Sequence, residues 1–538
     1  MKKLWILLFA LTMCIAAPAL ADAPVVINTP GEHTITLSGE NIVGVDSPAI
    51  NITEPHAKVT ILLKNGTTTT LTGDDNYAGL YIGSADVVIR CEGSDKESHT
   101  CTDTCGKLIA NGGNHSAGIG GNNYDESIGG AFNGSLTIMG GHINANGDRW
   151  AAGIGGGNNS AFNGEVNITG GVVTATSVSW GAGIGAARNN MNGSVTISGG
   201  VVTAIGGAYS AGIGSGNDDM NGTVILSGGT VTAIGGAHSA GIGSGNDDMN
   251  GTVIISGGTV TATGGIYGAG IGSGFGSVSG SVILSGGNVA ATGGAHGAGI
   301  GSGNGFMSGS VTISGGNVTA NGGEDGAGIG AGNYSMHGTV TISGGTVNAQ
   351  GSGNAAGIGA GNSSDLDGTV EITGGTVIAN GGNNAVGIGC GVRGSMNGNV
   401  IIKGGSVTAV AGETSMQSAT VPAPAIGASC HATLSQDAVI EVNPASGKIA
   451  VKAGADEGSA AALEGSPFTA KTSLKEALKD KPYAKFEFIA PPATPVPSPT
   501  PAPDVPATGD SMNFALLASL AAVSMLGVTV LLRKRNEA

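Results

Sequence analysis

The fold is decided by a short repeated unit, of which residues 251–279 are one copy: GTVIISGGTVTATGGIYGAGIGSGFGSVS. The unit contains three short extended segments. In the first segment, Val253 and Ile255 share one face and Ile254 lies on the other, and in the third segment Ile271 stands between two glycines. Alternation with a period of two and an abundance of β-branched residues predict strands rather than helices. The Gly-Gly pairs between the segments predict tight corners.

The Gly-Ile-Gly tripeptide marks the same point in successive copies of the unit. Between Ile184 and Ile358 the marks recur every 29 residues. One unit cannot bury its apolar side chains alone, so neighbouring units must stack. We therefore predict an all-β fold, a right-handed parallel β-helix of about 12 turns with three strands per turn, because a propeller blade needs about 40 residues or more. The marks are Ile82, Ile119, Ile154, Ile184, Ile213, Ile242, Ile271, Ile300, Ile329, Ile358, Ile388 and Ile426, of which the first and last stand in degenerate copies.

The composition excludes several classes of protein. Glycine accounts for 103 of the 538 residues, but it follows no Gly-X-Y period, so the chain is not collagen. Hydrophobic residues make up 40% of the sequence, which is too much for a disordered chain. The formal net charge of −16 argues against nucleic acid as a partner, because nucleic-acid binding needs clustered cations.

Residues 1–21 have the pattern of a secretory signal peptide. Lys2 and Lys3 precede an apolar stretch, and small residues at the spacing of a cleavage site follow it. Cleavage after Ala21 and cleavage after Ala23 both fit this pattern. Either site predicts a secreted protein.

The C-terminal region, residues 505–538, has three parts in a fixed order. A pentapeptide comes first, then the uncharged apolar stretch 514–532, and then a basic tail that starts at Arg533. An apolar stretch of this length can just span a bilayer, with the basic tail on the cytoplasmic side, so a simple transmembrane anchor is one interpretation. The pentapeptide consists of Val505, Pro506, Ala507, Thr508 and Gly509.

This C-terminal region resembles the sorting signal of sortase-anchored (LPXTG-type) cell-wall proteins of Gram-positive bacteria, with Val505 where such signals carry Leu. The resemblance implies that sortase cleaves between Thr508 and Gly509 and joins the Thr508 carbonyl to peptidoglycan. The mature protein would then lie on the cell-wall surface and have no membrane span. Residues 491–506 are rich in proline, which predicts an extended polyproline II linker through the wall.

The repeats resemble the Gly-rich, AGIGGG-type repeats of clostridial surface β-helix proteins, and some related modules bind polysaccharides. The resemblance covers about residues 50–430, so we assign 51–430 to the β-helix. The ends of a β-helix expose unpaired strand edges, which predicts an N-terminal cap over 22–50 and a C-terminal cap over 431–490. The sequence Ser473–Asp480 predicts one short helix in the C-terminal cap.

Ring-bearing side chains recur four residues before the marks. Flat rings repeating every ~4.8 Å would come close to the spacing of sugars in a polysaccharide, and apolar ring faces with polar edges suit sugar stacking. This pattern predicts a polysaccharide or host glycan as ligand. The alternative is that the rings stack on one another and only stiffen a corner. The candidate ligand-binding residues are His115, Trp150, Trp180, Tyr209, His238, Tyr267 and His296.

Two further columns are interpreted as structural. Seven residues after the marks stand mostly methionines, which predict core filling, and the next position is polar and rich in asparagine. Asparagines stacked in this way form hydrogen-bonded ladders. The first column holds Met191, Met220, Met249, Val278, Met307 and Met336, and the second holds Asn192, Asn221, Asn250, Ser279, Ser308 and His337.

Catalytic chemistry on polysaccharides needs paired carboxylates, or a carboxylate-bound Ca²⁺ with a basic partner. The few arginines of the regular turns share no column beside acids, so we predict no catalytic residues and no enzyme. The pairs Asp218–Asp219 and Asp247–Asp248 stack one turn apart and could share a Ca²⁺ ion, although solvated turn residues are the simpler interpretation. No other cofactor is expected.

Cysteines form two groups. Cys91, Cys101 and Cys105 lie on an insertion with His99 nearby, a spacing that allows a disulfide, free thiols or a Zn²⁺ site. A disulfide is the preferred interpretation outside the cell, so no metal site is assigned. Cys390 and Cys430 stand at nearly matching positions of the last two turns, which allows a bridge between them.

The sequence thus predicts a wall-anchored surface protein that acts as an adhesin or polysaccharide-binding module. A structural or spacer protein without a specific ligand is the alternative, and a polysaccharide-degrading enzyme is the third and least favoured.

Overall fold

The computed structural model describes residues 23–94, 101–124, 130–413 and 422–491. The signal peptide and the sorting region predicted from the sequence lie outside these residues, and so does His99. The described residues contain β-strands and no α-helix. They include no helix long and apolar enough to cross a membrane.

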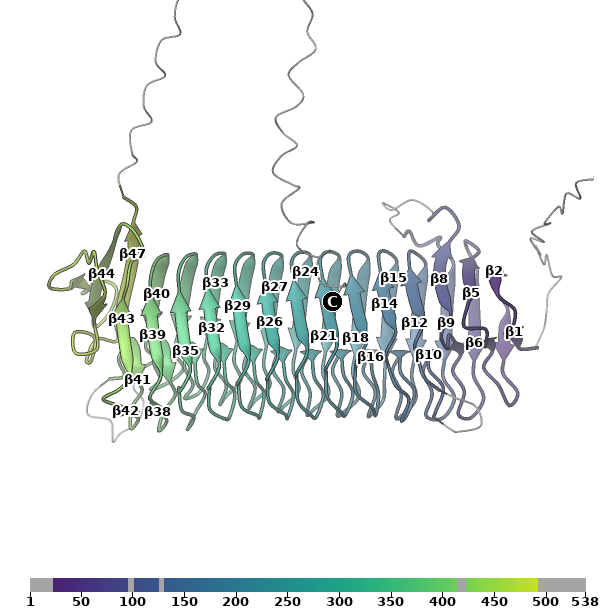
Figure 1. Cartoon of the computed structure of the whole chain (residues 1–538), viewed down its shortest axis with the longest axis horizontal. Coiled ribbons are helices and arrows are strands. Elements are labelled where there is room, and N and C mark those ends of the chain that lie inside the picture. Colours follow the sequence, from purple (N-terminus) through teal and green to yellow (C-terminus); the bar gives the residue numbers. More distant parts are fainter. Residues whose placement is uncertain (1–22, 95–100, 125–129, 414–421, 492–538) are drawn as a thin grey trace, which may run out of the picture. The chain divides into compact units, whose positions relative to one another are not determined.

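Each turn of the chain contributes one strand to each of three long sheets, which are parallel throughout the regular turns (Figure 1). The unit that begins at residue 251 forms β23 (Thr252–Ile255), β24 (Thr259–Thr263) and β25 (Ile271–Gly272). Its strands pair with those of the next turn, β26 (Ser281–Leu284), β27 (Asn288–Thr292) and β28 (Ile300–Gly301). The whole solenoid has about thirteen turns. The prediction of an all-β parallel β-helix is therefore confirmed.

The register follows the marks. Ile213 pairs with Ile242, and Ile242 pairs with Ile271, so residues 29 apart are immediate neighbours. The same column continues in both directions through every mark except Ile82. Leu80 takes that place opposite Ile119, so the prediction for Ile82 is wrong. Leu80 and Ile82 stand two residues apart and are both buried, which makes them equivalent in an alternating pattern.

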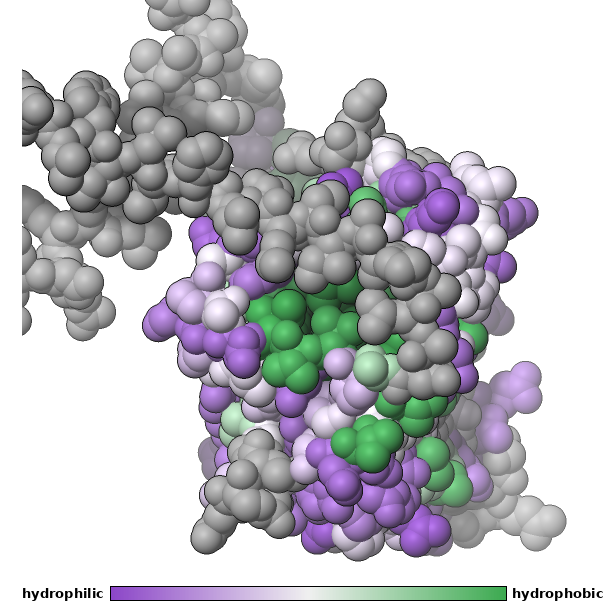
Figure 2. Space-filling model, turned by 90° about the vertical axis from the view of Figure 1, so that its right-hand side faces the viewer, coloured by the Kyte–Doolittle hydropathy of each residue, from purple (hydrophilic) through white to green (hydrophobic). Residues whose placement is uncertain are grey.

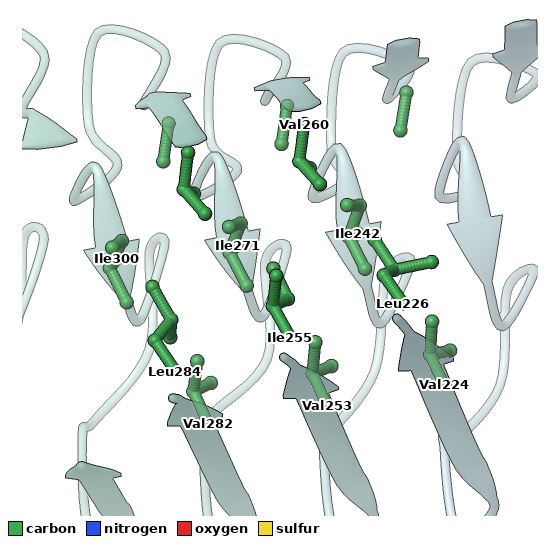
Figure 3. Packing of buried hydrophobic residues seen from close by; sticks show 14 of the residues in the cluster. Val224, Leu226, Ile242, Val253, Ile255, Val260, Ile271, Val282, Leu284 and Ile300 are labelled. Atoms are coloured by element: carbon green, nitrogen blue, oxygen red, sulfur yellow. The ribbon is translucent and has the colours of Figure 1, made fainter. Parts of the chain in front are cut away.

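The core is a narrow channel filled by stacked columns of apolar side chains. Val253 and Ile255 point into it beside Val282 and Leu284 of the next turn (Figure 3). The methionine column is fully buried, and its members pair from turn to turn, so its prediction as core filling is confirmed. Phe132 and Phe162 extend that column toward the N-terminus.

Glycine in the mark is required by both conformation and space. Gly243, which follows Ile242, has a φ of +131°, a value that L side chains rarely adopt. A Cβ atom added at this position would overlap the carbonyl oxygen of Gly272 in the next turn. The Gly-Ile-Gly tripeptide therefore recurs because a side chain at the second glycine would force the turns apart.

The N-terminal residues already belong to the solenoid. The first three strands pair in parallel with the three strands that follow, so they form the first turn rather than the separate cap expected over 22–50. Among the described residues, no strand pairs with their outer edges. Apolar side chains gather in the middle of this end of the solenoid (Figure 2). The strands are β1 (Val25–Ile27), β2 (Gly31–Leu37), β3 (Asn41–Val43), β4 (Ile50–Ile52), β5 (Ala57–Leu63) and β6 (Thr68–Thr72).

The C-terminal end is covered by antiparallel strands. β47 (Tyr483–Ile489) pairs with β40 (Ser406–Val410) of the last full turn and with β44 (Lys448–Gly454). This change from parallel to antiparallel pairing ends the solenoid, because the new strands no longer follow its winding. Phe486 of β47 is buried against the core.

The short helix predicted at Ser473–Asp480 is wrong. Ser473 belongs to β46 (Thr472–Ser473), which pairs antiparallel with β43 (Val439–Val442), and residues 475–480 form turns. Eight residues are too few to offset the cost of helix nucleation. Leu474 and Leu478 are instead buried against the end of the core, so tertiary packing decides the conformation.

Candidate functional site

The aromatic corner is the set of seven ring-bearing residues predicted from the sequence: His115, Trp150, Trp180, Tyr209, His238, Tyr267 and His296. Tyr267 lies in the loop between β24 and β25, and the other six occupy the equivalent loop of their own turns. The backbone N–H of Tyr267 donates to the carbonyl of Ala237, and that of His296 donates to the carbonyl of Ile266. Because the ladder of backbone hydrogen bonds continues through the corner, successive turns project their rings at the same point.

Five rings of the aromatic corner form one continuous stack. The centroids of Trp180 and Tyr209 lie 4.2 Å apart, and those of Tyr209 and His238 lie 4.8 Å apart. The distances from His238 to Tyr267 and from Tyr267 to His296 are 5.0 and 5.2 Å. Neighbouring ring planes differ by 28° at most. The rings therefore repeat at the turn spacing expected from the sequence.

Charged groups link and end the stacks. His115 and Trp150 form a second stack, with centroids 4.3 Å apart. The guanidinium carbon of Arg188 lies 5.1 Å from the Trp150 ring centroid and 5.5 Å from that of Trp180, within cation–π range of both. At the far end, Nδ1 of His296 lies 2.7 Å from a carboxylate oxygen of Asp325. The aromatic corner is thus continuous across the break between its two stacks.

This stacking decides what the corner can contact. All seven side chains are partly exposed, but inside the five-ring stack each ring face is covered by the ring of the next turn. A sugar ring cannot stack on a covered face. Self-stacking, the alternative left open by the sequence, is the arrangement that the structure has. Only ring edges are left for a ligand there.

A second group of rings, which sequence reasoning missed, lies beside the corner. Phe275, Phe306 and Tyr334 are 43%, 41% and 45% exposed, and we call them the loop cluster. They stand in the loops that follow the third strand in three successive turns. Phe306 and Tyr334 meet edge to face at 5.2 Å, and Phe275 meets the edge of Tyr267 at 5.7 Å. The loop cluster is therefore joined to the aromatic corner through Phe275.

The loop cluster lines a surface hollow of about 470 Å³. Carboxylates and amides line the same hollow, in particular Asp219, Asp247, Asn246 and Asn304. Exposed aromatic rings supply apolar platforms, and carboxylate and amide groups supply hydrogen bonds, which is the combination that a sugar with apolar faces and hydroxyl edges requires. The hollow is therefore the best-formed candidate binding site beside the aromatic corner.

The loop cluster escaped the sequence analysis because its members share no column. Phe275, Phe306 and Tyr334 stand four, six and five residues after their marks. Reading one position through all turns therefore finds each of them alone. The signal that could have found them is three aromatic residues in the same loop of successive turns, in loops otherwise made of Gly, Ser and Asn.

The four aspartates of the pairs Asp218–Asp219 and Asp247–Asp248 have different partners. Asp219 accepts the backbone N–H of Asp248 at 3.1 Å, and Asp248 accepts that of Ser277 at 2.7 Å, so both fasten successive turns. Asp218 and Asp247 accept only a side-chain amide from the preceding asparagine. Partial burial, together with the carboxylates of Asp218 and Asp219, raises the pKa of Asp247 above its usual range. Ca²⁺ binding by these pairs stays a prediction.

The asparagine ladder predicted from the sequence is present. The side-chain amide of Asn192 donates to Asn163 at 3.1 Å, that of Asn221 donates to Asn192 at 3.4 Å, and that of Asn250 donates to Asn221 at 3.2 Å. These bonds run along the outside of the solenoid from turn to turn. The ladder is structural, as predicted.

The two cysteine groups differ in geometry. The sulfur of Cys91 lies 3.2 Å from that of Cys105 and 4.0 Å from that of Cys101. Cys390 is instead paired in register with Ala428, and Cys430 lies two residues further on in a separate small apolar cluster. The register therefore does not place Cys390 opposite Cys430. Burial raises the pKa of the Cys390 thiol to about 12.

One chain wound into three parallel sheets, with a core of stacked columns, defines a parallel β-helix protein. Comparison of the sequence with protein families supports this class, because nine segments match the family described as the β-helix repeat. No curated protein and no solved structure matches the chain. The matched segments are residues 136–158, 166–188, 195–217, 224–246, 253–275, 282–304, 311–333, 340–362 and 370–392.

Proposed function

We propose that the protein is a secreted surface protein, anchored to the cell wall, whose β-helix binds polysaccharide at the loop cluster. The observation that carries this proposal is the hollow in which Phe275, Phe306 and Tyr334 lie beside Asp247. Three exposed rings in successive turns give a ligand several contacts along the solenoid axis. A polymer with a repeating backbone can use all of them at once.

The aromatic corner contributes rigidity to this site. The backbone N–H of Phe275 donates to the carbonyl of His238 at 2.8 Å, and its ring touches the rings of His238 and Tyr267. The stack thus fixes the loop that carries Phe275 before any ligand arrives. A preorganised site loses less conformational entropy on binding, which favours affinity.

The charge of the hollow narrows the class of polysaccharide. Its lining includes Asp219, Asp247 and Asp248 and no basic residue. A polyuronate brings further carboxylates and would be repelled, whereas neutral sugars can donate hydroxyl groups to these oxygens. We therefore expect neutral polysaccharides as ligands.

Display on the wall is proposed from the two ends of the chain. The signal pattern over 1–21, the proline-rich stretch 491–506 and the three-part region 505–538 support it together. If sortase joins Thr508 to peptidoglycan, the protein should be released from cells by a muramidase and not by detergent. Thr508→Ala should shift the protein from the wall fraction to the membrane or the medium.

A glycan array probed with the mature chain tests the binding proposal. We expect binding to neutral polysaccharides and its loss in the triple variant Phe275→Ala, Phe306→Ala, Tyr334→Ala. A matched control carries Val178→Ala and Ile378→Ala, which remove exposed apolar side chains outside the hollow. Binding that persists in the triple variant, or an array without any binding, would contradict the proposal.

One observation favours a second function, that of a structural spacer. The ring faces of the aromatic corner are used for turn-to-turn stacking, which stiffens the solenoid without any ligand. A spacer would retain full stability and wall display in the triple variant and would bind nothing on the array.

A further inference from the structure

An insertion near the N-terminal end brings three cysteine sulfurs together. Cys91 is the last residue of β8 (Asp86–Cys91), Cys105 lies just before β9 (Lys107–Asn111), and Cys101 lies in the connection between these strands. Their three sulfur atoms all lie within 4.8 Å of one another. In the part of the chain that the structure describes, no other group of three or more metal-binding side chains is gathered as closely.

The surroundings of the three sulfurs suit thiolates that bind a metal. Cys91 and Cys105 are 0% and 3% exposed, whereas Cys101 is partly exposed, so the group lies at the edge of the core with access from one side. The backbone N–H of Gly141, from the following turn, donates to the sulfur of Cys101 at 2.9 Å. Hydrogen bonds of this kind orient metal ligands and stabilise their charge.

We propose that Cys91, Cys101 and Cys105 bind a Zn²⁺ ion through their three sulfurs. A disulfide would use two of these sulfurs and would leave the third without a role, whereas a metal ion explains why all three converge. Thiolate ligands select soft ions such as Zn²⁺ over Ca²⁺ or Mg²⁺. On binding, each thiol releases its proton to solvent, and the remaining coordination position is open to water. This proposal replaces the disulfide preferred from the sequence and is independent of glycan binding.

The ion would fasten the insertion to the solenoid. Cys91 and Cys105 lie at the two ends of the connection between β8 and β9, and Gly141 belongs to the next turn. Three bonds from one ion would therefore hold together two strand ends and the loop between them. We expect the metal to stabilise this end of the solenoid rather than to take part in chemistry.

Metal analysis of the mature chain, purified with Zn²⁺ and without chelator, is the first test. We expect about one Zn²⁺ per chain, and Co²⁺ in its place should give an intense sulfur-to-cobalt absorption band in the near ultraviolet. Cys101→Ser should weaken Zn²⁺ binding at least tenfold, whereas the control Cys390→Ser should bind as the wild type does. A chelator should lower the melting temperature of the wild type and leave that of Cys101→Ser unchanged.

A disulfide gives the opposite set of results. Peptide mapping would find Cys91 joined to Cys105 with a mass 2 Da lower, no Zn²⁺ would be retained by oxidised or reduced protein, and Cys101→Ser would change nothing. Should Cys101→Ser fail to fold, Cd²⁺ titration of the reduced wild-type chain decides the matter without a variant. Absence of a sulfur-to-cadmium band in that titration would overturn the proposal.

Discussion

Trp180 and Tyr209, 29 residues apart in the sequence, stack face to face with their ring centroids 4.2 Å apart and their planes 14° apart. This contact joins two successive turns at the corner of the solenoid. It converts a repeat in the sequence into a continuous stack of side chains. The same stack fixes the loop that carries Phe275, so the corner contributes both to stability and to the proposed binding site.

The first prediction concerns this stack. A double-mutant cycle with Trp180→Ala and Tyr209→Ala should give a coupling energy of about 0.5–1.5 kcal/mol, the usual value for a stacked aromatic pair. Urea unfolding of the four proteins measures it. The matched control combines Trp180→Ala with Tyr267→Ala, whose rings do not touch, and these changes should add. Equal coupling in both cycles would count against direct stacking.

The second prediction concerns the glycine of the mark. Gly243→Ala should lower the free energy of unfolding by more than about 2 kcal/mol, because it combines a strained φ with an overlap against Gly272. Gly458→Ala is the control, since that glycine lies in a cap loop with open space around it. Thermal unfolding compares the two variants. Similar melting temperatures for both variants would show that the turns are not packed as described.

The third prediction concerns pH. The pKa of Asp247 is raised in the folded protein, so its ionised form opposes folding above that pKa, and the penalty is lost as the pH falls below the unfolded value of about 4. Asp247→Asn should therefore raise the melting temperature at pH 7, and the gain should vanish near pH 3. Asp437→Asn, on the exposed surface of the cap, serves as control. A gain independent of pH would refute this explanation.

The fourth prediction concerns Cys390. Its thiol is fully buried and its pKa is raised to about 12, so almost no thiolate is present at pH 8. Iodoacetamide should leave Cys390 unmodified in the native protein at pH 8 and label it rapidly in urea. Mass spectrometry of the corresponding peptide measures both rates. Labelling of native protein at the unfolded rate would contradict its place in the core.

Periodicity explains how much of the fold could be predicted. A strict spacing of 29 residues places Ile213, Ile242 and Ile271 in one column, and the same arithmetic locates the buried methionines and the rings of the corner. The arithmetic fails where the period breaks. Leu80 replaces Ile82 in the column because alternation cannot tell residues two apart from each other.

Features that depend on tertiary packing could not be read from the period. The segment after Ser473 has the pattern of a short helix, but the end of the core offers burial to Leu474 and Leu478 in a turn conformation. The loop cluster is hidden for a related reason, since its rings reach one hollow from unequal positions. Convergence of side chains in space is visible only in the folded chain.

The most direct test of the account is the affinity of the mature chain for the neutral polysaccharide that binds best on the array. Isothermal titration calorimetry should show at least a tenfold weaker binding for the triple variant Phe275→Ala, Phe306→Ala, Tyr334→Ala, because each stacked ring contributes about 0.5–1.5 kcal/mol. The control with Val178→Ala and Ile378→Ala should bind as tightly as the wild type. Equal affinities for all three proteins would contradict a binding site at the loop cluster.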